Sequence, residues 1–355
     1  MSSDMWESIV RSLSTPSVSA AFNSFLDREL SIGQGIRSKA SDSQNHLREF
    51  LASERSRDCS FPRVLSLQDS DFLGGSFARH TKIWPLDDID VYIPLDGHGL
   101  FYHEHGLQLP YTVVSDGVLT SNPLLGPRWM IDNQVSSNKL IREFTAVLQR
   151  HYGESTSVEP NGQAVSVRMT HGQTKDEDGL GYDVVPCFSM KPDDSTESSW
   201  YGIPDGKNGW IRTNPRLDTY ISDELQRFNS GHYRKAVKLL KHWNKENLNS
   251  AFTSYYIELA MAIEFFGRKI HSQSLTSVSE GVSVGFARLQ QAFQSGNLSG
   301  WIKGAPQVQA PILSARQQGM LHFVTAKAKA AYDSEVLGNS DQALEHWKNI
   351  FGERF

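Results

Sequence analysis

The sequence predicts an α+β protein made of a sheet-containing part followed by a helical part. The chain has 355 residues, which corresponds to about two domains at roughly 150 residues each. Short apolar segments typical of strands fill the middle of the chain, at 86–93, 155–169 and 182–188. From about residue 214 apolar residues recur at helical spacing instead. We therefore expect residues 1–212 and 213–355 to form two domains.

The composition excludes several classes of protein. The net charge is −5, so any basic surface must be local. The cysteines, Cys59 and Cys187, have no CxxC spacing, which predicts a reducing compartment without a disulfide or zinc framework. Residues 1–6 lack the features of a signal peptide, and the longest apolar-rich run, 255–266, is too short to span a bilayer. We expect a soluble, cytoplasmic protein that does not enter a membrane.

An acidic pair on a predicted strand is the most informative feature of the sequence. Asp88 and Asp90 follow a Gly75-Ser76 turn. In a strand, residues i and i+2 project from the same face, roughly 6.6 Å apart. Both carboxylates therefore lie together, while Ile89 and Val91 face a core. Adjacent carboxylates repel unless a cation neutralises them, and Mg²⁺ prefers oxygen ligands and leaves positions open for phosphate. The pair predicts a metal site for a nucleoside triphosphate.

A further acidic residue opens another apolar strand. Residues 155–169 predict a hairpin around Asn161-Gly162, the strongest short hairpin signal. A polar loop, 171–181, then leads into a strand that begins at Asp183. An acid on an apolar strand is costly unless it is paired or bound to a metal, although it can also be a strand-end residue at the surface. Asp87, beside the acidic pair, is expected to point to the opposite face.

Flanking segments complete the first domain. Residues 1–30 predict a helical lead-in and residues 36–54 a long helix. Residues 96–133 contain several glycines and prolines with little periodicity, so we expect a surface loop there, including its three histidines. Apolar residues recur every fourth position over 140–152, which predicts an amphipathic helix that is capped by the preceding serines and packs on the sheet.

The second domain is predicted to be helical. Asn214-Pro215 indicates a helix start, because asparagine caps a helix and proline suits its first turn. After a break at Ser230-Gly231, the helix 232–247 is expected to bury one apolar side. Another helix begins near residue 251, and the remainder is helical apart from 300–311. A basic stripe on the helix 232–247, typical of a solvated face, consists of Arg234, Lys238, Lys241 and Lys245.

Together these motifs resemble the DNA polymerase β-like nucleotidyltransferase superfamily. The Gly-Ser turn, Asp88-x-Asp90, the Asp-Val-Val-Pro that begins at Asp183, the lysine-rich helix and a Ser254-Tyr255 pair occur in family order. With the C-terminal segment 343–352, the chain resembles bacterial CD-NTases, the cyclic GMP–AMP synthase/DncV-like nucleotidyltransferases of CBASS anti-phage systems. His80 stands where the family often has glycine, which is expected to narrow the donor pocket.

The resemblance implies a fold and a set of site residues. The fold is a polymerase β-like palm, a mixed β-sheet with a long spine helix, plus a C-terminal α-helical domain in a bilobed arrangement. Two Mg²⁺ ions, replaceable by Mn²⁺, would be held by Asp88, Asp90 and Asp183. Gly75, Ser76 and Ser254 would bind the phosphates of the donor nucleotide. A lysine would contact the same phosphates, with Lys241 as the first candidate and Lys238 as the second. Tyr255 would stack on the base.

The implied activity is the joining of NTPs into a cyclic di- or trinucleotide second messenger in anti-phage defence. Its substrates would be ATP together with GTP or another NTP, and a downstream effector would bind the product. The sequence gives no sign of direct DNA binding, because the ligands of a zinc ribbon are missing.

Three alternatives stay open at this point. The enzyme could transfer a single nucleotide to a tRNA, protein or small-molecule acceptor, as other superfamily members do. The chain could instead be an inactive nucleotide-binding or scaffold protein, although its three carboxylates argue against that. Tyr255 could simply pack between helices.

Overall fold

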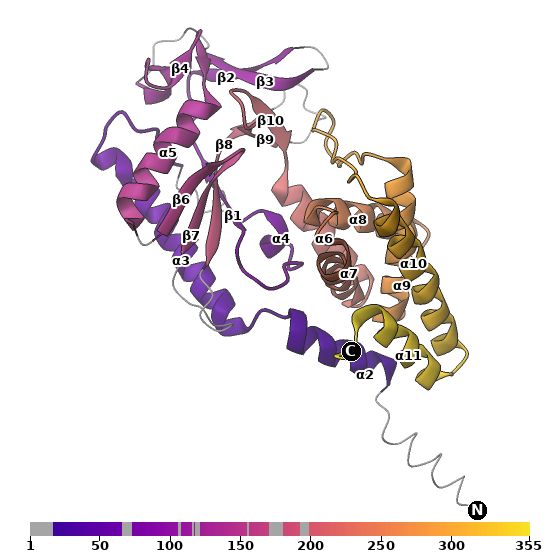
Figure 1. Ribbon diagram of the computed structural model, residues 1–355. Coiled ribbons are helices and arrows are strands. Elements are labelled where there is room, and N and C mark those ends of the chain that lie inside the picture. Colours follow the sequence, from indigo (N-terminus) through magenta and orange to yellow (C-terminus); the bar gives the residue numbers. More distant parts are fainter. Residues whose placement is uncertain are drawn as a thin grey trace, which may run out of the picture.

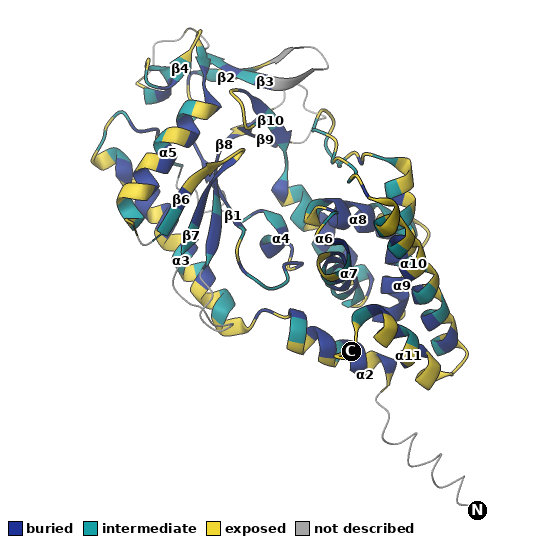
Figure 2. Cartoon of the chain, viewed as in Figure 1, coloured by how far each residue is buried: buried dark blue, intermediate teal, exposed yellow. Residues whose placement is uncertain are grey.

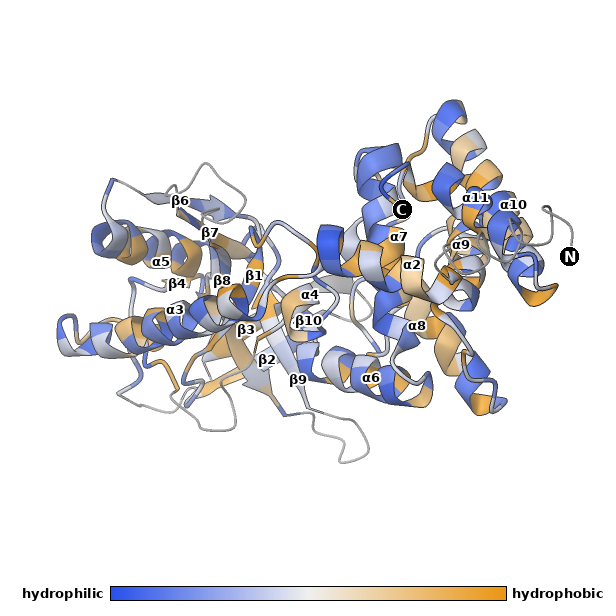
Figure 3. Ribbon diagram, turned by 90° about the horizontal axis from the view of Figure 1, so that it is seen from below, coloured by the Kyte–Doolittle hydropathy of each residue, from blue (hydrophilic) through white to orange (hydrophobic). Residues whose placement is uncertain are grey.

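A sheet lobe and a helical lobe lie side by side in the structure (Figure 1). The computed structural model describes residues 17–65, 73–105, 108–115, 117, 121–154, 156–169, 180–191 and 199–355. Viewed from below, the short helix α4 (Gly75–Ala78) lies between the two lobes (Figure 3). Buried residues gather inside each lobe, and exposed residues cover the outer faces of the helices (Figure 2).

The described residues form one 10-stranded mixed sheet. Its order is β4-β5-β3-β10-β9-β8-β7-β6, with β1 added beside β8 and β2 beside β3. The β1–β8 pair is parallel, and the other pairs are antiparallel. The strands are β1 Ile89–Pro94, β2 Leu100–His105, β3 Gln108–Ser115, β4 Met130–Ile131, β5 Gln134–Val135, β6 Thr156–Asn161, β7 Ala164–Met169, β8 Gly181–Met190, β9 Trp200–Pro204 and β10 Trp210–Thr213.

Two helices cover the sheet lobe. Helix α3 (Gln34–Ser53) is the predicted long helix, and α5 (Ser137–Tyr152) is the predicted amphipathic one. The side chain of Ser136 caps α5 by accepting a hydrogen bond from Lys139 N. The apolar face of α5, including Leu140, packs on β6 and β7. This packing fixes the β6–β7 hairpin, whose strand β7 pairs with β8.

The helical lobe is built around a second hydrophobic core. Asn214 caps α6 and Pro215 begins it, as predicted. The break between α6 and α7 is formed by Ser230 and Gly231, which both have positive φ. The helices of this lobe after the sheet are α6 Pro215–Phe228, α7 His232–Leu248, α8 Ser254–Ile270, α9 Val278–Ser295, α10 Ala315–Val336 and α11 Ser340–Phe351.

The N-terminal helix belongs to the helical core rather than to the sheet core. Helix α2 (Val18–Phe25) and the π-helical turn Leu26–Leu30 contribute buried residues to the core of the helical lobe. The predicted boundary between residues 212 and 213 falls at the end of β10, two residues before α6 begins. From residue 17 onward the described chain therefore runs from the helical lobe into the sheet lobe through α3, and it returns to the helical lobe at α6.

The prediction of a surface loop over residues 96–133 is wrong, because this segment contains paired strands. Strands β2 and β3 form a hairpin there, and His103 lies in β2. Tyr111 of β3 pairs with Trp210 of β10, so the partner strand lies about a hundred residues away in sequence. A short strand with a distant partner leaves little local pattern.

Two predictions fall on residues that the structure does not describe. These are the helical lead-in before residue 17 and most of the polar loop 171–181. No helix within the described ranges is long and apolar enough to cross a membrane.

Candidate active site

The Gly-Ser turn brings the backbone against the first acidic strand. Gly74 N donates a hydrogen bond to Asp90 O at 3.1 Å. Gly75 has φ +62°, and a Cβ built on it would overlap the Asp90 carboxylate. Ser76 is buried, and its carbonyl accepts hydrogen bonds from Thr81 N and Lys82 N. Only glycine at position 75 permits both this conformation and this approach.

Parallel pairing brings Asp90 beside Asp183. The two residues are register partners on β1 and β8, and neighbouring strands lie about 4.8 Å apart with paired side chains on the same face. On its other side, Asp183 Oδ1 accepts hydrogen bonds from Ser166 Oγ at 2.6 Å and from Arg168 Nη2 at 3.0 Å. The three-strand unit β1-β8-β7 thus joins residues that are far apart in sequence.

Lys82 neutralises Asp88, the third of the carboxylates that are predicted to bind metal. Its ammonium forms an ion pair with Asp88, which is half-exposed, and lies 2.7 Å from Asp87 Oδ1. Asp87 is exposed and does not line the cleft that Asp88 and Asp90 share. The side chain of Asp87 therefore stays outside this cleft, but it is held by the same lysine as Asp88.

The carboxylates repel one another in this arrangement. Burial, followed by the charge of Asp88, raises the pKa of Asp90 to about 7. Burial also raises the pKa of Asp88, and the charge of Lys82 opposes that rise. The charge of Asp183 acts in the same upward direction on the pKa of both residues. A cation placed among the three carboxylates would relieve this repulsion.

The donor set suits Mg²⁺, but the side chains are engaged elsewhere. No group of three acidic, histidine or cysteine side chains within the described residues converges closely enough to enclose an ion as it stands. The reason lies in the contacts just given, since Lys82 holds Asp88 and Arg168 holds Asp183. Carboxylate oxygens on adjacent strands are the right ligands for a hard cation, and binding one requires these two side chains to turn away from their basic partners.

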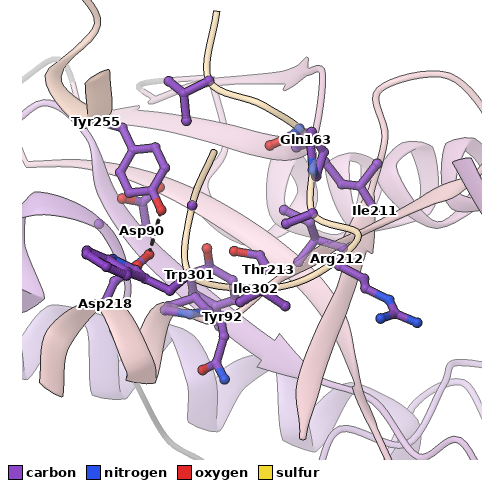
Figure 4. A pocket seen from close by; sticks show the side chains of 18 of the residues that line it. Asp90, Tyr92, Gln163, Ile211, Arg212, Thr213, Asp218, Tyr255, Trp301 and Ile302 are labelled. Atoms are coloured by element: carbon purple, nitrogen blue, oxygen red, sulfur yellow. Dashed lines mark hydrogen bonds between the residues drawn. The ribbon is translucent and has the colours of Figure 1, made fainter. Parts of the chain in front are cut away.

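A cleft of about 390 Å³ opens beside the acidic strand. Asp90, Asp218 and Tyr255 lie toward one side of the close view, and Gln163 and Arg212 lie toward the other (Figure 4). The hydroxyl of Tyr255 donates to Asp218 Oδ2 at 3.0 Å. The cleft is lined by residues from both lobes, namely Gly75, Ser76, Arg79, Asp88, Asp90, Tyr92, Gln163, Ile203, Ile211, Arg212, Thr213, Asn214, Pro215, Asp218, Ser254, Tyr255, Gly300, Trp301, Ile302, Ala305, Pro306, Gln307 and Val308.

A buried charge network supports one side of the cleft. Glu258 forms ion pairs with both Arg79 and Lys241, and all three residues are buried. Burial alone would raise the pKa of Glu258, but Arg79 and Lys241 lower it to about 2. The Arg79 guanidinium also lies 5.4 Å from the centroid of the Tyr255 ring. Arg79 thus links the Gly-Ser segment to α8.

Lys241 is the buried member of the basic stripe of α7, whereas Arg234 and Lys238 are partly buried and Lys245 is exposed. Lys241 Nζ donates to Thr81 O at 3.2 Å as well as contacting Glu258, and Arg234 pairs with Asp223. Burial, then the charge of Arg37, lowers the pKa of Lys238 to about 8. Neither Lys238 nor Lys241 lines the cleft, so contact with a donor phosphate requires movement of their side chains.

The structure brings most of the predicted nucleotide-binding residues together. Gly75, Ser76, Ser254 and Tyr255 line one cleft with Asp88 and Asp90, and Asp183 lies one strand away. Sequence reasoning missed five further residues that line the cleft, namely Arg79, Gln163, Arg212, Asp218 and Trp301. One signal was present, because Glu258 interrupts an apolar helix and a buried charge implies a buried partner.

His80 does not narrow the cleft. It has φ 58°, the left-handed conformation that glycine adopts freely. Its side chain lies outside the cleft lining, with Nδ1 at 3.2 Å from Arg37 Nη1. The expectation of a narrowed donor pocket was therefore wrong.

The contact between Gly75 and Asp90 gives a direct prediction. Gly75→Ala is expected to displace the Asp90 carboxylate and to lower nucleotide turnover by about a hundredfold, the effect of a shift near 1 Å at a reacting group. Gly153→Ala is the matched control, because Gly153 has φ +69° with nothing near its would-be Cβ. Turnover and thermal unfolding of both variants should be measured. Full activity in Gly75→Ala would show that this contact does not position Asp90.

Comparisons with known proteins agree with the fold and the motifs. No protein-family model matches the chain. It is 25% identical over 309 residues to a curated protein of Bacillus cereus (strain VD146) named probable cyclic nucleotide synthase, covering 83% of this chain and 84% of that protein. Two solved structures of E. coli MS115-1 CdnC match at 16% identity and cover 95% of this chain and 98% of CdnC. The structure with ATP has a TM-score of 0.62, and the complex with HORMA-deltaN has 0.61. The resemblance identified in the sequence is confirmed: the chain is similar in sequence to a protein named probable cyclic nucleotide synthase and has the fold of CdnC.

Proposed function

We propose that the protein is a metal-dependent nucleotidyltransferase that joins NTPs into a cyclic di- or trinucleotide, a second messenger in anti-phage defence. The observation that carries this proposal is the pairing of Asp90 with Asp183 on adjacent parallel strands, directly beside Gly75. The name of the Bacillus cereus relative, a probable cyclic nucleotide synthase, supports the same reaction.

The acidic residues would act on the hydroxyl and phosphate groups of the substrates. Two Mg²⁺ ions bound to Asp88, Asp90 and Asp183, with Mn²⁺ as a substitute, would supply positive charge to the attacking hydroxyl and the leaving pyrophosphate. A ribose hydroxyl forms a bond to an α-phosphorus while the bond from that phosphorus to pyrophosphate breaks. Asp183 helps to remove the hydroxyl proton. A further transfer within the linear product closes the ring and releases another pyrophosphate.

The cleft would orient the donor nucleotide. Ser76 and the turn at Gly75 face the triphosphate, where backbone amides donate hydrogen bonds without side-chain bulk. Tyr255 offers an aromatic face for the base, and Ser254 begins α8 at the same end of the cleft. Lys241 and Lys238 supply positive charge behind the turn. The carboxylates and these groups act by positioning and electrostatics rather than by covalent chemistry.

We further propose ATP as one substrate, together with GTP or another NTP, and a downstream effector that binds the cyclic product. CdnC has been solved with ATP, and the cleft of about 390 Å³ in this chain falls in the size range of small-molecule sites.

The test is incubation of the purified protein with labelled NTPs and Mg²⁺ or Mn²⁺. The expected result is a phosphatase-resistant small product, with pyrophosphate released in proportion, whose bases and ring size are read by mass spectrometry. A matched reaction without added metal should give no product.

Two other outcomes would contradict cyclisation. Product that forms only after addition of a tRNA, protein or small-molecule acceptor would assign single-nucleotide transfer instead. Failure to release pyrophosphate with any NTP and either metal would leave a nucleotide-binding or scaffold role.

A further inference from the structure

A hairpin-like segment from the helical lobe reaches across the cleft to the sheet lobe. We call residues 298–308, between α9 and α10, the strap (Figure 1). Leu298 and Val308 close its base through two backbone hydrogen bonds of 2.9 and 2.7 Å. Near its tip Ala305 N donates to Ile302 O at 3.2 Å. These bonds make the strap a structured element rather than an open loop.

The strap forms a wall of the nucleotide cleft. Seven of its residues line the cleft, including Trp301 and Ile302 near the tip. These two residues lie on the cleft side in the close view (Figure 4). The Trp301 ring is 5.5 Å from the ring of Phe266 on α8, which anchors this side of the strap to the helical lobe. A nucleotide in the cleft would therefore lie between the strap and the acidic strand β1.

Two residues of the sheet lobe hold the tip. Tyr111 Oη donates to Gly304 O at 3.0 Å, and Arg212 Nη1 donates to Lys303 O at 3.3 Å. The Arg212 guanidinium is fixed in turn by aromatic rings, with the Trp200 centroid at 4.3 Å and the Tyr111 centroid at 4.9 Å. The tip contacts are thus preorganised by buried residues of β3, β9 and β10.

We propose that the strap retains the linear intermediate in the cleft between successive transfers, and that Tyr111 and Arg212 are the positioning residues that keep it closed. The proposal rests on the cyclic-nucleotide function proposed above. Ring closure requires the intermediate to turn without leaving, because its free hydroxyl must reach its own α-phosphorus. A wall that bridges the lobes and is held by two hydrogen bonds can open to admit substrate and shut to keep the intermediate.

Tyr111→Phe tests the latch with a minimal change. It removes one hydroxyl, and the loss of about 1 kcal/mol for one hydrogen bond corresponds to about a fivefold shift toward the open strap. The measured quantity is the ratio of released linear to cyclic product, which we expect to rise by about that factor. Tyr102→Phe is the control. Tyr102 also lies beside Arg212, with the guanidinium 5.8 Å from its ring, but within the described residues its hydroxyl makes no hydrogen bond to the strap.

Gly304→Ala tests the same contact from the side of the strap. A Cβ on Gly304 would lie 2.7 Å from Tyr111 Oη, and φ at this position is +77°. Its matched control is Gly338→Ala, where φ is +81° and no atom lies within 4 Å of the would-be Cβ. We expect the linear-to-cyclic ratio to rise in Gly304→Ala and to stay at the wild-type value in Gly338→Ala.

The product ratio separates positioning from a merely structural role. A change that only weakens the fold lowers both transfers and leaves the ratio unchanged. Wild-type ratios in both Tyr111→Phe and Gly304→Ala, with cyclic product still made, would overturn the strap proposal and leave the proposed function intact. Absence of pyrophosphate release from the wild-type protein would overturn both.

Discussion

Asp90→Ala and Asp88→Ala are each expected to abolish nucleotide transfer, with a loss on the order of a thousandfold or more. Each removes a carboxylate from the proposed metal site, so the remaining acids would no longer hold the proposed ions at the leaving pyrophosphate. The fold should survive, because Asp88 is half-exposed and both residues lie at a cleft rather than in the core. Pyrophosphate release and far-UV circular dichroism measure these two expectations.

Asp87→Ala is the matched control for this pair. Asp87 is the neighbouring residue of the same type and contacts the same Lys82, but it does not line the cleft. It should retain nucleotide transfer near the wild-type level. Turnover by a purified Asp88→Ala/Asp90→Ala double variant would reject the assignment of the acidic site.

Glu258→Gln is expected to lower the free energy of unfolding by about 3–5 kcal/mol, the cost of leaving buried charges unpaired. Glu258 neutralises Arg79 and Lys241, and all three side chains are buried. The change leaves both cations without this partner. Chemical denaturation at pH 7 measures the loss. Glu246→Gln, at an exposed glutamate of α7, is the control and should change stability by no more than about 0.5 kcal/mol.

The stability loss in Glu258→Gln should depend on pH. The folded-state pKa of Glu258 is about 2, below the ordinary value of 4.5. A carboxylate with a lowered pKa in the folded state stabilises the fold above its unfolded pKa, and this contribution disappears as the pH falls through the folded pKa. The difference between wild type and variant should therefore be constant above about pH 5 and narrow toward pH 2. A difference that widens on acidification would contradict the assigned charge state.

The strands that carry the acidic residues were predictable, because the sequence features that indicate them are local. The Gly-Ser turn, Asp90 of β1 with Asp88 just before the strand, and the Asn161-Gly162 hairpin each lie within a few consecutive residues. Their order along the chain also carried the resemblance to nucleotidyltransferases. The parallel register that pairs Asp90 with Asp183 is a tertiary feature that the local sequence pattern did not give.

The rest of the site depends on contacts that sequence patterns do not encode. Strands β2 and β3 lie in a segment with glycine, proline and histidine, and Tyr111 gains its role only by pairing with Trp210 and bonding to Gly304. The burial of Lys241 was also not predictable, because helical spacing places Lys241 and Lys245 on one face of the helix without showing what packs against that face. Burial of Lys241 follows from Glu258 on a neighbouring helix.

Anomalous diffraction from crystals grown with Mn²⁺ and a non-hydrolysable NTP tests the central claim most directly. We predict manganese peaks at Asp88, Asp90 and Asp183, with the triphosphate beside Gly75 and Ser76 and the side chains of Asp88 and Asp183 turned away from Lys82 and Arg168. Manganese bound to the nucleotide alone, with Asp183 still held by Arg168, would contradict the proposed three-carboxylate site.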